Sequence, residues 1–281
     1  KAEFYTMKID LVLFRIIFKQ SLPFALLVLL MSFYYRLDTV MVERLLPDGR
    51  VQAGIYYQAY RLMEGFNMFG YLFAGLLLPI FSRMLKNKES VAKLVQTSFN
   101  LIFIPAVAVA LVSVLYPQEI MDLLYVANII ESAEIFSVLM LSFIAISLTY
   151  VYGTLLTANG SLKHLNAISL IGLVLNFVSN WVMIPIYGAW GAAVATLITQ
   201  FFVIFAQIII TKSVFKMKYE FPFVLKQFIL IGVGGGLSIY SVSYFSDFRI
   251  HAVAIATLFG ALALILGLVK KSDVVKVLKG S

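Results

Sequence analysis

Eight long apolar stretches follow one another along this chain, and each is close to the length needed to cross a lipid bilayer. The chain has 281 residues, of which 62% are hydrophobic and only 13% are charged. A soluble domain is about 45–50% apolar and about 25% charged, and a helical span needs about 20 mostly apolar residues. The sequence therefore predicts an all-α, polytopic transmembrane helix bundle with spans at roughly 21–45, 53–81, 94–116, 134–157, 164–184, 189–211, 224–245 and 251–269.

The distribution of Lys and Arg predicts how these spans are oriented. Seventeen of the 22 Lys and Arg residues fall in the N-terminal arm, the even-numbered loops and the C-terminal tail, whereas the odd-numbered loops hold only Arg44, Arg50 and Arg249. Because cytoplasmic loops of membrane proteins carry an excess of basic residues, both termini are predicted to be cytoplasmic. The net charge of +8 then reflects topology and attraction to anionic lipids, and we expect no nucleic-acid partner.

Several classes of site are missing from the sequence. The absence of cysteine excludes a disulfide scaffold, a thiolate metal site and a cysteine nucleophile. No phosphate-binding glycine loop, metal-ligand cluster or Ser/His/acid set is recognisable, so we expect neither an enzyme nor a metal site. His164 and His251 lie near the ends of predicted spans, where we interpret them as interfacial polar residues.

The first 20 residues differ from the spans that follow. Residues 8–20 mix apolar positions with charges and end just before Pro23, which is typical of an amphipathic helix at a membrane surface. We therefore expect residues 1–20 to form an interfacial arm that leads into the first span. The sequence begins at Lys1, without an initiator Met, and we interpret this start as a truncation.

Four charged residues lie inside the first two spans: Arg36 and Asp38 in one, and Arg61 and Glu64 in the next. An ionisable group at membrane depth costs about 2.5–3.5 kcal/mol on insertion scales and persists where it is paired or lines a wet cavity. At a rise of about 1.5 Å per residue, Asp38 matches Arg61 in depth and Arg36 matches Glu64. However, Arg36 and Asp38 are two positions apart, about 200° around the helix, so they cannot both face the second span. Two interpretations stay open, an interhelical ion-pair network and a set of charges lining a substrate or ion path.

Other polar residues lie within the predicted spans. The outer half of the second span is polar, Asn176 and Asn180 are one turn apart on the fifth, and the sixth contains Thr196, Thr199 and Gln200. Such residues commonly form hydrogen bonds between helices, and they can also line a path for a polar substrate. The candidate substrate-binding residues are Arg36, Asp38, Tyr60, Arg61, Glu64, Asn67, Asn176 and Asn180.

Five segments carry a resemblance to a known family. They are RLDTVMVER at 36–44, AYRLME at 59–64, LLLPIFSR at 76–83, TLLTANGS at 154–161 and PIYGAWGAAVAT at 185–196. Together they resemble the C-terminal part of Wzx-type polysaccharide or O-antigen flippases, which belong to the MOP exporter superfamily. The resemblance covers about residues 15–211, and the last two spans fit by position alone.

The resemblance implies a particular architecture. Such flippases have two six-helix lobes around a central cavity, often with two further helices. Residues 21–211 would form the six-span second lobe, and residues 212–281 would supply two extra spans and a basic cytoplasmic tail. The first lobe would be absent from this chain, and it is therefore an expected partner.

The resemblance also implies a function. The protein would translocate undecaprenyl-diphosphate-linked oligosaccharide across the bacterial inner membrane, with that lipid and the surrounding membrane lipids as partners and no cofactor apart from a coupling ion, H⁺ or Na⁺. Arg36 and Arg61 would contact the diphosphate, Asp38 and Glu64 would orient them or bind the ion, and the lobes would rock around the site. Alternatives are a cation-coupled multidrug exporter or lipid II flippase of the same superfamily, a membrane-embedded glycan polymerase or acyltransferase, and a structural subunit.

Overall fold

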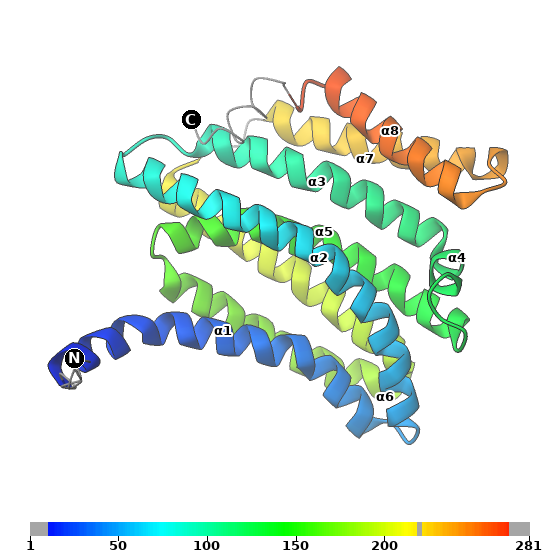
Figure 1. The fold of residues 1–281 in the computed structure, drawn as a ribbon, viewed down its shortest axis with the longest axis horizontal. Coiled ribbons are helices and arrows are strands. Elements are labelled where there is room, and N and C mark those ends of the chain that lie inside the picture. The colour runs from blue at the N-terminus through cyan, green and yellow to red at the C-terminus, as the bar shows by residue number, and fades with distance from the viewer. Residues whose placement is uncertain (1–10, 218–220, 270–281) are drawn as a thin grey trace, which may run out of the picture.

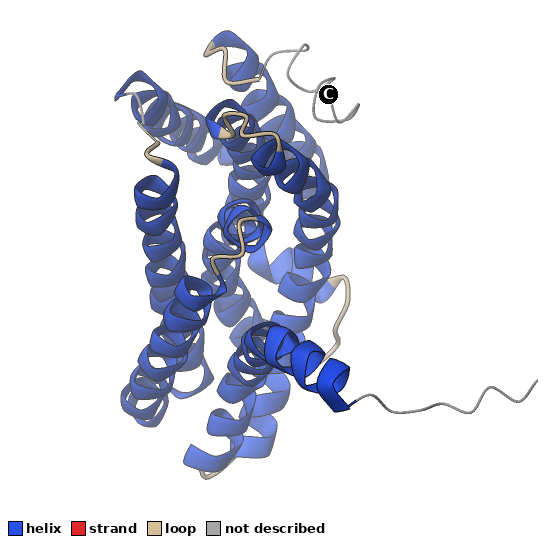
Figure 2. Ribbon diagram, turned by 90° about the vertical axis from the view of Figure 1, so that its left-hand side faces the viewer, coloured by secondary structure: helices blue, strands red, loops and turns tan. Residues whose placement is uncertain are grey.

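The computed structural model describes residues 11–217 and 221–269, and within these ranges every regular element is a helix (Figure 2). Seven helices in this part of the chain are long and apolar enough to cross a membrane. The predicted all-α, polytopic membrane bundle is therefore confirmed. In chain order the elements are α1 (Leu11–Leu45), α2 (Gly49–Lys86), α3 (Ala92–Leu115), α4 (Pro117–Asp122), α5 (Ile129–Ala158), α6 (Leu162–Phe215), α7 (Phe221–Ser241), the 3₁₀ turn η1 (Val242–Tyr244) and α8 (Phe248–Ile265).

Helix α6 folds back on itself at Gly188 and so supplies two membrane crossings. Its 54 residues would extend about 81 Å if straight, far beyond a hydrocarbon core of about 30 Å. Gly188 breaks the helix with φ 62° and ψ −147°, a backbone conformation that is essentially restricted to glycine. After it the two limbs run antiparallel, because Gly172 of the first limb faces Thr199 and Val203 of the second. The seven long helices thus make eight crossings, and the break falls in the short link expected between the fifth and sixth spans.

The helices form a bundle in which α5 is central and packs against α2, α3 and α6. Helix α1 lies along one side of the bundle, against α6 and the adjacent part of α2, and α7 and α8 lie on the other side next to α3 (Figure 1). Buried side chains of α5 fill both parts of the core, with Phe136 and Met140 among α1, α2 and α6 and Tyr152 among α3, α7 and α8. This arrangement leaves a large cavity between α1, α2, α5 and α6.

Polar contacts at both ends fasten α7 and α8 to α3. At one end Asn100 of α3 donates to the Leu268 carbonyl at 2.7 Å and accepts from Gln227 of α7 at 2.8 Å. At the other end His251 of α8 bonds Tyr116 at 2.6 Å and Ser241 at 2.8 Å.

The direction of the second network follows from its partners. Ser241 donates its hydroxyl proton to the Ser238 carbonyl, so it accepts from His251 Nε2–H, and Nδ1 is left to accept from Tyr116. His251 is therefore a buried residue that joins α7 and α8 to the end of α3.

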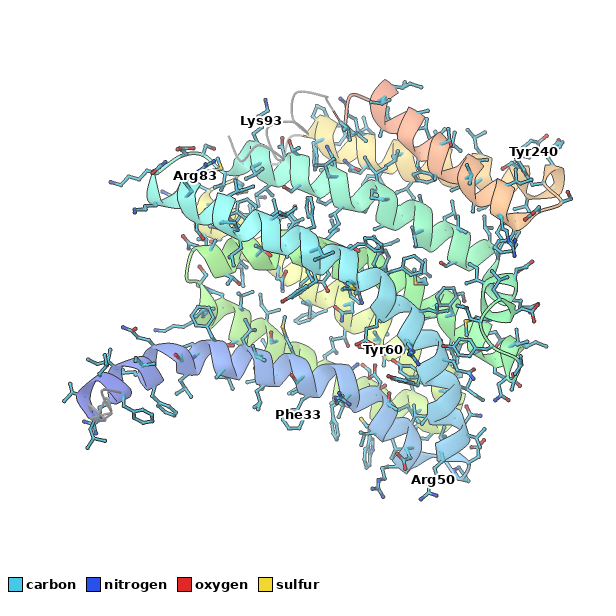
Figure 3. The ribbon with its side chains drawn as sticks, viewed as in Figure 1. Phe33, Arg50, Tyr60, Arg83, Lys93 and Tyr240 are labelled. Carbon is cyan, nitrogen blue, oxygen red and sulfur yellow. The ribbon has the colours of Figure 1, made fainter. Side chains whose placement is uncertain are left out.

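The charged ends of the bundle are well separated. Arg83 and Lys93 lie near the turn between α2 and α3, at the end of the bundle opposite to Arg50 in the turn between α1 and α2 (Figure 3). Eight crossings place both ends of the described chain on one side of a membrane. That this side is cytoplasmic stays a prediction.

The predicted arm lies partly in a continuous helix. Helix α1 runs from Leu11 to Leu45 without a break at residue 20 (Figure 1), and residues 11–20 are exposed. At about 52 Å, α1 is longer than the hydrocarbon core, so its first turns extend past it. Residues 1–10 and the basic tail at 270–281 lie outside the described residues.

We predict that Gly191→Ala destabilises the fold-back of α6. A Cβ atom at Gly191 would collide with the carbonyl oxygen of Met183 on the opposite limb, and relieving such a backbone clash costs about 1–3 kcal/mol. Thermal unfolding in detergent, followed by size-exclusion chromatography, measures the loss. The control is Gly236→Ala on α7, where a Cβ atom meets nothing within 4 Å; equal melting temperatures for the two variants would contradict the prediction.

Candidate functional site

A buried carboxylate connects three helices toward the end of the bundle that carries the turn between α1 and α2. Asp38 of α1 is only 3% exposed. It accepts hydrogen bonds from Tyr56 of α2 at 2.7 Å, from Asn180 Nδ2 of α6 at 2.6 Å and from the Thr196 hydroxyl, also of α6. Asn180 and Thr196 lie eight positions before and after Gly188, so the fold-back brings one donor from each limb to the same carboxylate.

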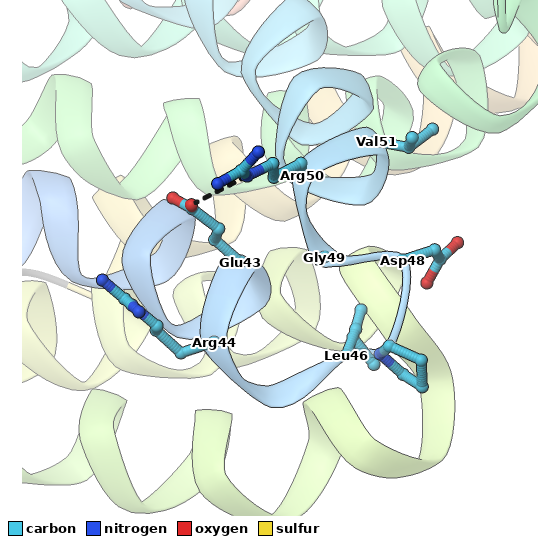
Figure 4. A pocket seen from close by; sticks show the side chains of 8 residues that line it. Glu43, Arg44, Leu46, Asp48, Gly49, Arg50 and Val51 are labelled. Atoms are coloured by element: carbon cyan, nitrogen blue, oxygen red, sulfur yellow. Dashed lines mark ion pairs between the residues drawn. The ribbon is translucent and has the colours of Figure 1, made fainter.

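Neutral groups stabilise this carboxylate. A buried charge is costly unless it is paired or well hydrogen-bonded. The one ion pair between described residues is Arg50–Glu43, at 3.9 Å in the exposed turn between α1 and α2 (Figure 4), and it lies outside the bundle core. Asp38 therefore depends on its three donors, of which Asn180 and Tyr56 are completely buried.

Two amides extend the Asp38 cluster. Asn180 Nδ2 also donates to Asn176 Oδ1, one turn earlier on α6, at 3.1 Å. The remaining amide atoms, Asn180 Oδ1 and Asn176 Nδ2, are buried without a hydrogen-bond partner. An unsatisfied buried polar atom costs about 1–3 kcal/mol. Two such atoms lie beside the Asp38 carboxylate, so this cluster has more hydrogen-bonding capacity than the contacts within the fold use.

A large cavity lies next to this cluster, between α1, α2, α5 and α6. Its volume is about 1010 Å³, at the upper end of the range for small-molecule sites. The α1 side contributes Leu27, Leu30, Met31 and Val40, together with Ser32, Arg36 and Thr39. The polar lining from the other helices includes Tyr57, Tyr60, Glu64, Asn67 and Tyr71 of α2 and Thr149, Thr154, Gln200 and Gln207 of α5 and α6, and apolar residues such as Met68, Ile146, Leu165 and Val203 lie among them. The cavity lining therefore mixes apolar and polar side chains on every helix that borders it.

Seven of the eight predicted site residues lie in one of these two places. Arg36, Tyr60, Glu64 and Asn67 line the cavity, whereas Asp38, Asn176 and Asn180 form the buried cluster behind it. Arg61 is exposed and does not line the cavity. The opposite directions expected for Arg36 and Asp38 are observed, because Arg36 faces the cavity and Asp38 faces α6.

Of the two interpretations left open for these charges, an ion-pair network is not observed in the described part of the chain. Neither Asp38 with Arg61 nor Arg36 with Glu64 forms an ion pair there, since the Arg50–Glu43 contact is the one salt bridge between described residues. Equal depth does not bring the charges together, because Asp38 points to α6 and Arg61 is exposed on α2.

Two residues of these sites were not predicted from the sequence: Tyr56 in the Asp38 cluster and Gln207 in the cavity lining. Tyr56, the donor to Asp38, is one position from the noted Tyr57 but on the opposite, buried face of α2, with Ala59 and Met63. That apolar spacing of three and four residues was a signal for its burial. Gln207 is an isolated amide in a strongly apolar segment, and nothing in its neighbours distinguished it.

A shallower pocket of about 330 Å³ lies at the turn between α1 and α2 (Figure 4). Its charged lining includes Glu43, Arg44, Asp48 and Arg50. Arg50 is 93% exposed, and ion pairs this accessible to water contribute little to binding or stability. The pocket is a solvated loop surface.

We predict that Thr196→Val lowers stability more than Thr199→Val does. Both threonines are buried in α6, but Thr196 bonds the Asp38 carboxylate and Thr199 bonds the Ala195 carbonyl of its own helix. Removing a donor from a buried carboxylate costs about 1–3 kcal/mol, whereas the loss of a bond within one turn costs less. Thermal unfolding of both variants in detergent measures the difference, and equal shifts would contradict the importance of the Asp38 contact.

Comparisons with known proteins give the fold a context. No family model and no characterised protein matches the sequence. The structure of the lipid II flippase MurJ, in an inward closed conformation, is similar with a TM-score of 0.65 and 13% identity over 86% of this chain and 52% of that one. A MOP superfamily transporter from Pyrococcus furiosus, described as having a binding pocket of reverse polarity, is similar with a TM-score of 0.57 and 19% identity over 80% of this chain and 52% of that one.

These identities are low, so the likeness concerns the fold. The chain spans about half the length of each of the two solved structures. It therefore has the helical fold seen in one half of two MOP-type membrane transporters.

Proposed function

We propose that this chain is part of a MOP-superfamily flippase that moves undecaprenyl-diphosphate-linked oligosaccharide across a bacterial inner membrane. The observation that carries the proposal is the cavity of about 1010 Å³ between α1, α2, α5 and α6. Its lining mixes apolar side chains with hydroxyl, amide and charged ones, and this combination suits a substrate that is part lipid and part sugar. The likeness in fold to a flippase and to a MOP transporter supports the same class.

Arg36 is the residue proposed to bind the diphosphate. It lines the cavity from α1, and among the described residues it has no acidic partner within 4.0 Å. A guanidinium group forms strong, charge-assisted and often bidentate hydrogen bonds with phosphate oxygens. The other charged residue in the lining is Glu64, so within the cavity Arg36 is the group that would attract an anionic lipid.

Lipid II flipping is the second candidate function. The similar MurJ structure is described as a lipid II flippase, and its likeness to this chain supports lipid II as much as another lipid-linked glycan. The two substrates share the chemistry that the cavity addresses, a lipid, a diphosphate and sugars. They differ in the attached glycan, so transport assays with each lipid separate them.

A second helical lobe is the proposed partner. The two similar transporters are about twice as long as the part that matches. Large apolar residues of α2, such as Phe69, Leu72 and Leu76, are exposed in this chain, and they would be covered by such a lobe or by lipid. Rocking of two lobes around the cavity would expose the substrate alternately to the two sides of the membrane.

The Asp38 cluster is proposed to hold the coupling cation. Hard cations are bound by oxygen ligands, and Asp38, Thr196 and the two asparagines supply such atoms. Rotating the Asn180 amide by 180° would turn its unpartnered oxygen toward Asp38, an arrangement that a cation between the two would favour. A single carboxylate balances one positive charge, so Na⁺ or H⁺ fits better than a divalent ion.

We predict that Arg36→Gln in the full-length protein abolishes most glycan export. Loss of a charge-assisted hydrogen bond to the diphosphate costs about tenfold or more in affinity. Complementation of a flippase-null strain measures surface glycan against lipid-linked precursor retained inside. The matched control is Arg50→Gln, because Arg50 is almost fully exposed at the turn; full export by the Arg36 variant would contradict the proposal.

We also predict that Na⁺ stabilises the protein through Asp38. A ligand that binds the folded state at ten times its Kd adds about 1.4 kcal/mol of stability, which raises the melting temperature. The measurement compares NaCl with choline chloride at equal ionic strength, for the parent protein and for Asp38→Asn. A rise with choline, or an equal rise in the variant, would contradict a sodium site. Export that depends on Asp38 and on a pH gradient would then assign the coupling to H⁺.

A further inference from the structure

The cavity contains a neutral polar region that the diphosphate does not account for. Its lining on α5 and α6 carries amide and hydroxyl side chains: Thr149, Thr154, Gln200 and Gln207. We call these four residues the amide subsite. None of them is charged, and α6 presents Gln200 and Gln207 two turns apart along one face.

Gln207 is the most constrained member of this subsite. It is only 3% exposed, it lines the cavity, and its amide oxygen has no hydrogen-bond partner. The amide lies over Gly153 of α5, with both terminal atoms within 3.6 Å of where a Cβ atom of Gly153 would be. An unpartnered buried acceptor costs free energy, and a turn of the Gln207 side chain toward the cavity that it lines would let a ligand satisfy it.

Gln207, at one end of the subsite, is separated from the charged part of the cavity. Gly70 of α2 meets Tyr150 of α5, and Gly153, three residues further along α5, meets Gln207. This register places Gln207 about nine residues, or about 13 Å, beyond Glu64 along the bundle. A ligand that contacts both regions must therefore be extended, with an anionic group near Arg36 and an uncharged polar group near Gln207.

We propose that the amide subsite binds the sugar part of the transported lipid. Sugars present many hydroxyl groups that both donate and accept hydrogen bonds, and amide and hydroxyl side chains match both roles without a charge. Tyr150 and Tyr71, which also line the cavity, provide ring surfaces beside these groups. This inference rests on the proposed flippase function and identifies the side chains that bind the glycan.

The test compares two lipids that differ in their sugars. Full-length protein in detergent is titrated with lipid-linked oligosaccharide purified from the host and with undecaprenyl diphosphate, and bound lipid is measured by native mass spectrometry. Gln207→Met keeps the length of the side chain but removes the amide. It is expected to lower the affinity for the glycan-bearing lipid about 3- to 10-fold, the effect of one lost hydrogen bond. It is expected to leave the affinity for undecaprenyl diphosphate unchanged, whereas Arg36→Gln lowers the affinity for both lipids.

A matched control and a second variant guard against misfolding. Thr211→Val lies one turn further along α6, is fully buried with an unpartnered hydroxyl, and does not line the cavity, so it is expected to leave both affinities unchanged. Thr154→Val, on α5, is expected to lower the affinity for the glycan-bearing lipid alone, as Gln207→Met does.

Three results would overturn the inference. The amide subsite does not bind the sugar if both subsite variants have the parent protein's affinity for the two lipids, or if they lower both affinities equally. In either case the proposed function is still tested separately by the response to Arg36→Gln. If the parent protein binds neither lipid, the proposed function fails, and this inference fails with it.

Discussion

The fold-back of α6 at Gly188 is the constraint on which the rest of this structure depends. Without it, Asn180 and Thr196 would lie about 24 Å apart along one straight helix, and no single carboxylate could reach both. With it, the two limbs return to the same depth and donate to Asp38 from both sides. A backbone conformation available only to glycine therefore decides where a buried charge can be tolerated.

Asp38 in turn fixes the position of α1. The helix is exposed along much of its length, and its buried polar contacts to α6 and α2 meet at this residue. On the far side of the same helix Arg36 faces the cavity, because two positions correspond to a rotation of about 200°. One short segment of α1 thus carries Asp38, which bonds α6 and α2, and Arg36, which faces the cavity.

The sequence predicted some of this arrangement and could not predict the rest. Helix lengths, the break near Gly188 and the opposite directions of Arg36 and Asp38 follow from apolar periodicity, turn residues and helix geometry, all of which are local. The partners of Asp38 lie 142 and 158 positions away, and their approach depends on how α6 packs against α1. Depth along a helix can be predicted from sequence, but the direction of a side chain toward a distant helix cannot, and this is why the equal depth of Asp38 and Arg61 left an ion pair between them undecided. Gln207 was missed for the same reason, since only packing against Gly153 gives it a cavity to face.

The two sites share a helix, and this has a consequence for coupling under the proposed function. A cation bound at Asp38 would compete with the donors Thr196 and Asn180 for the carboxylate oxygens, and so would change the contacts that hold α1 against α6. Because α1 also lines one side of the cavity and carries Arg36, any shift of this helix changes the width of the cavity and the position of its positive charge. Ion binding and substrate binding would then be linked through one rigid element, and linkage of this kind is reciprocal. No further path between the sites is needed, since two residues of the same helical turn already join them.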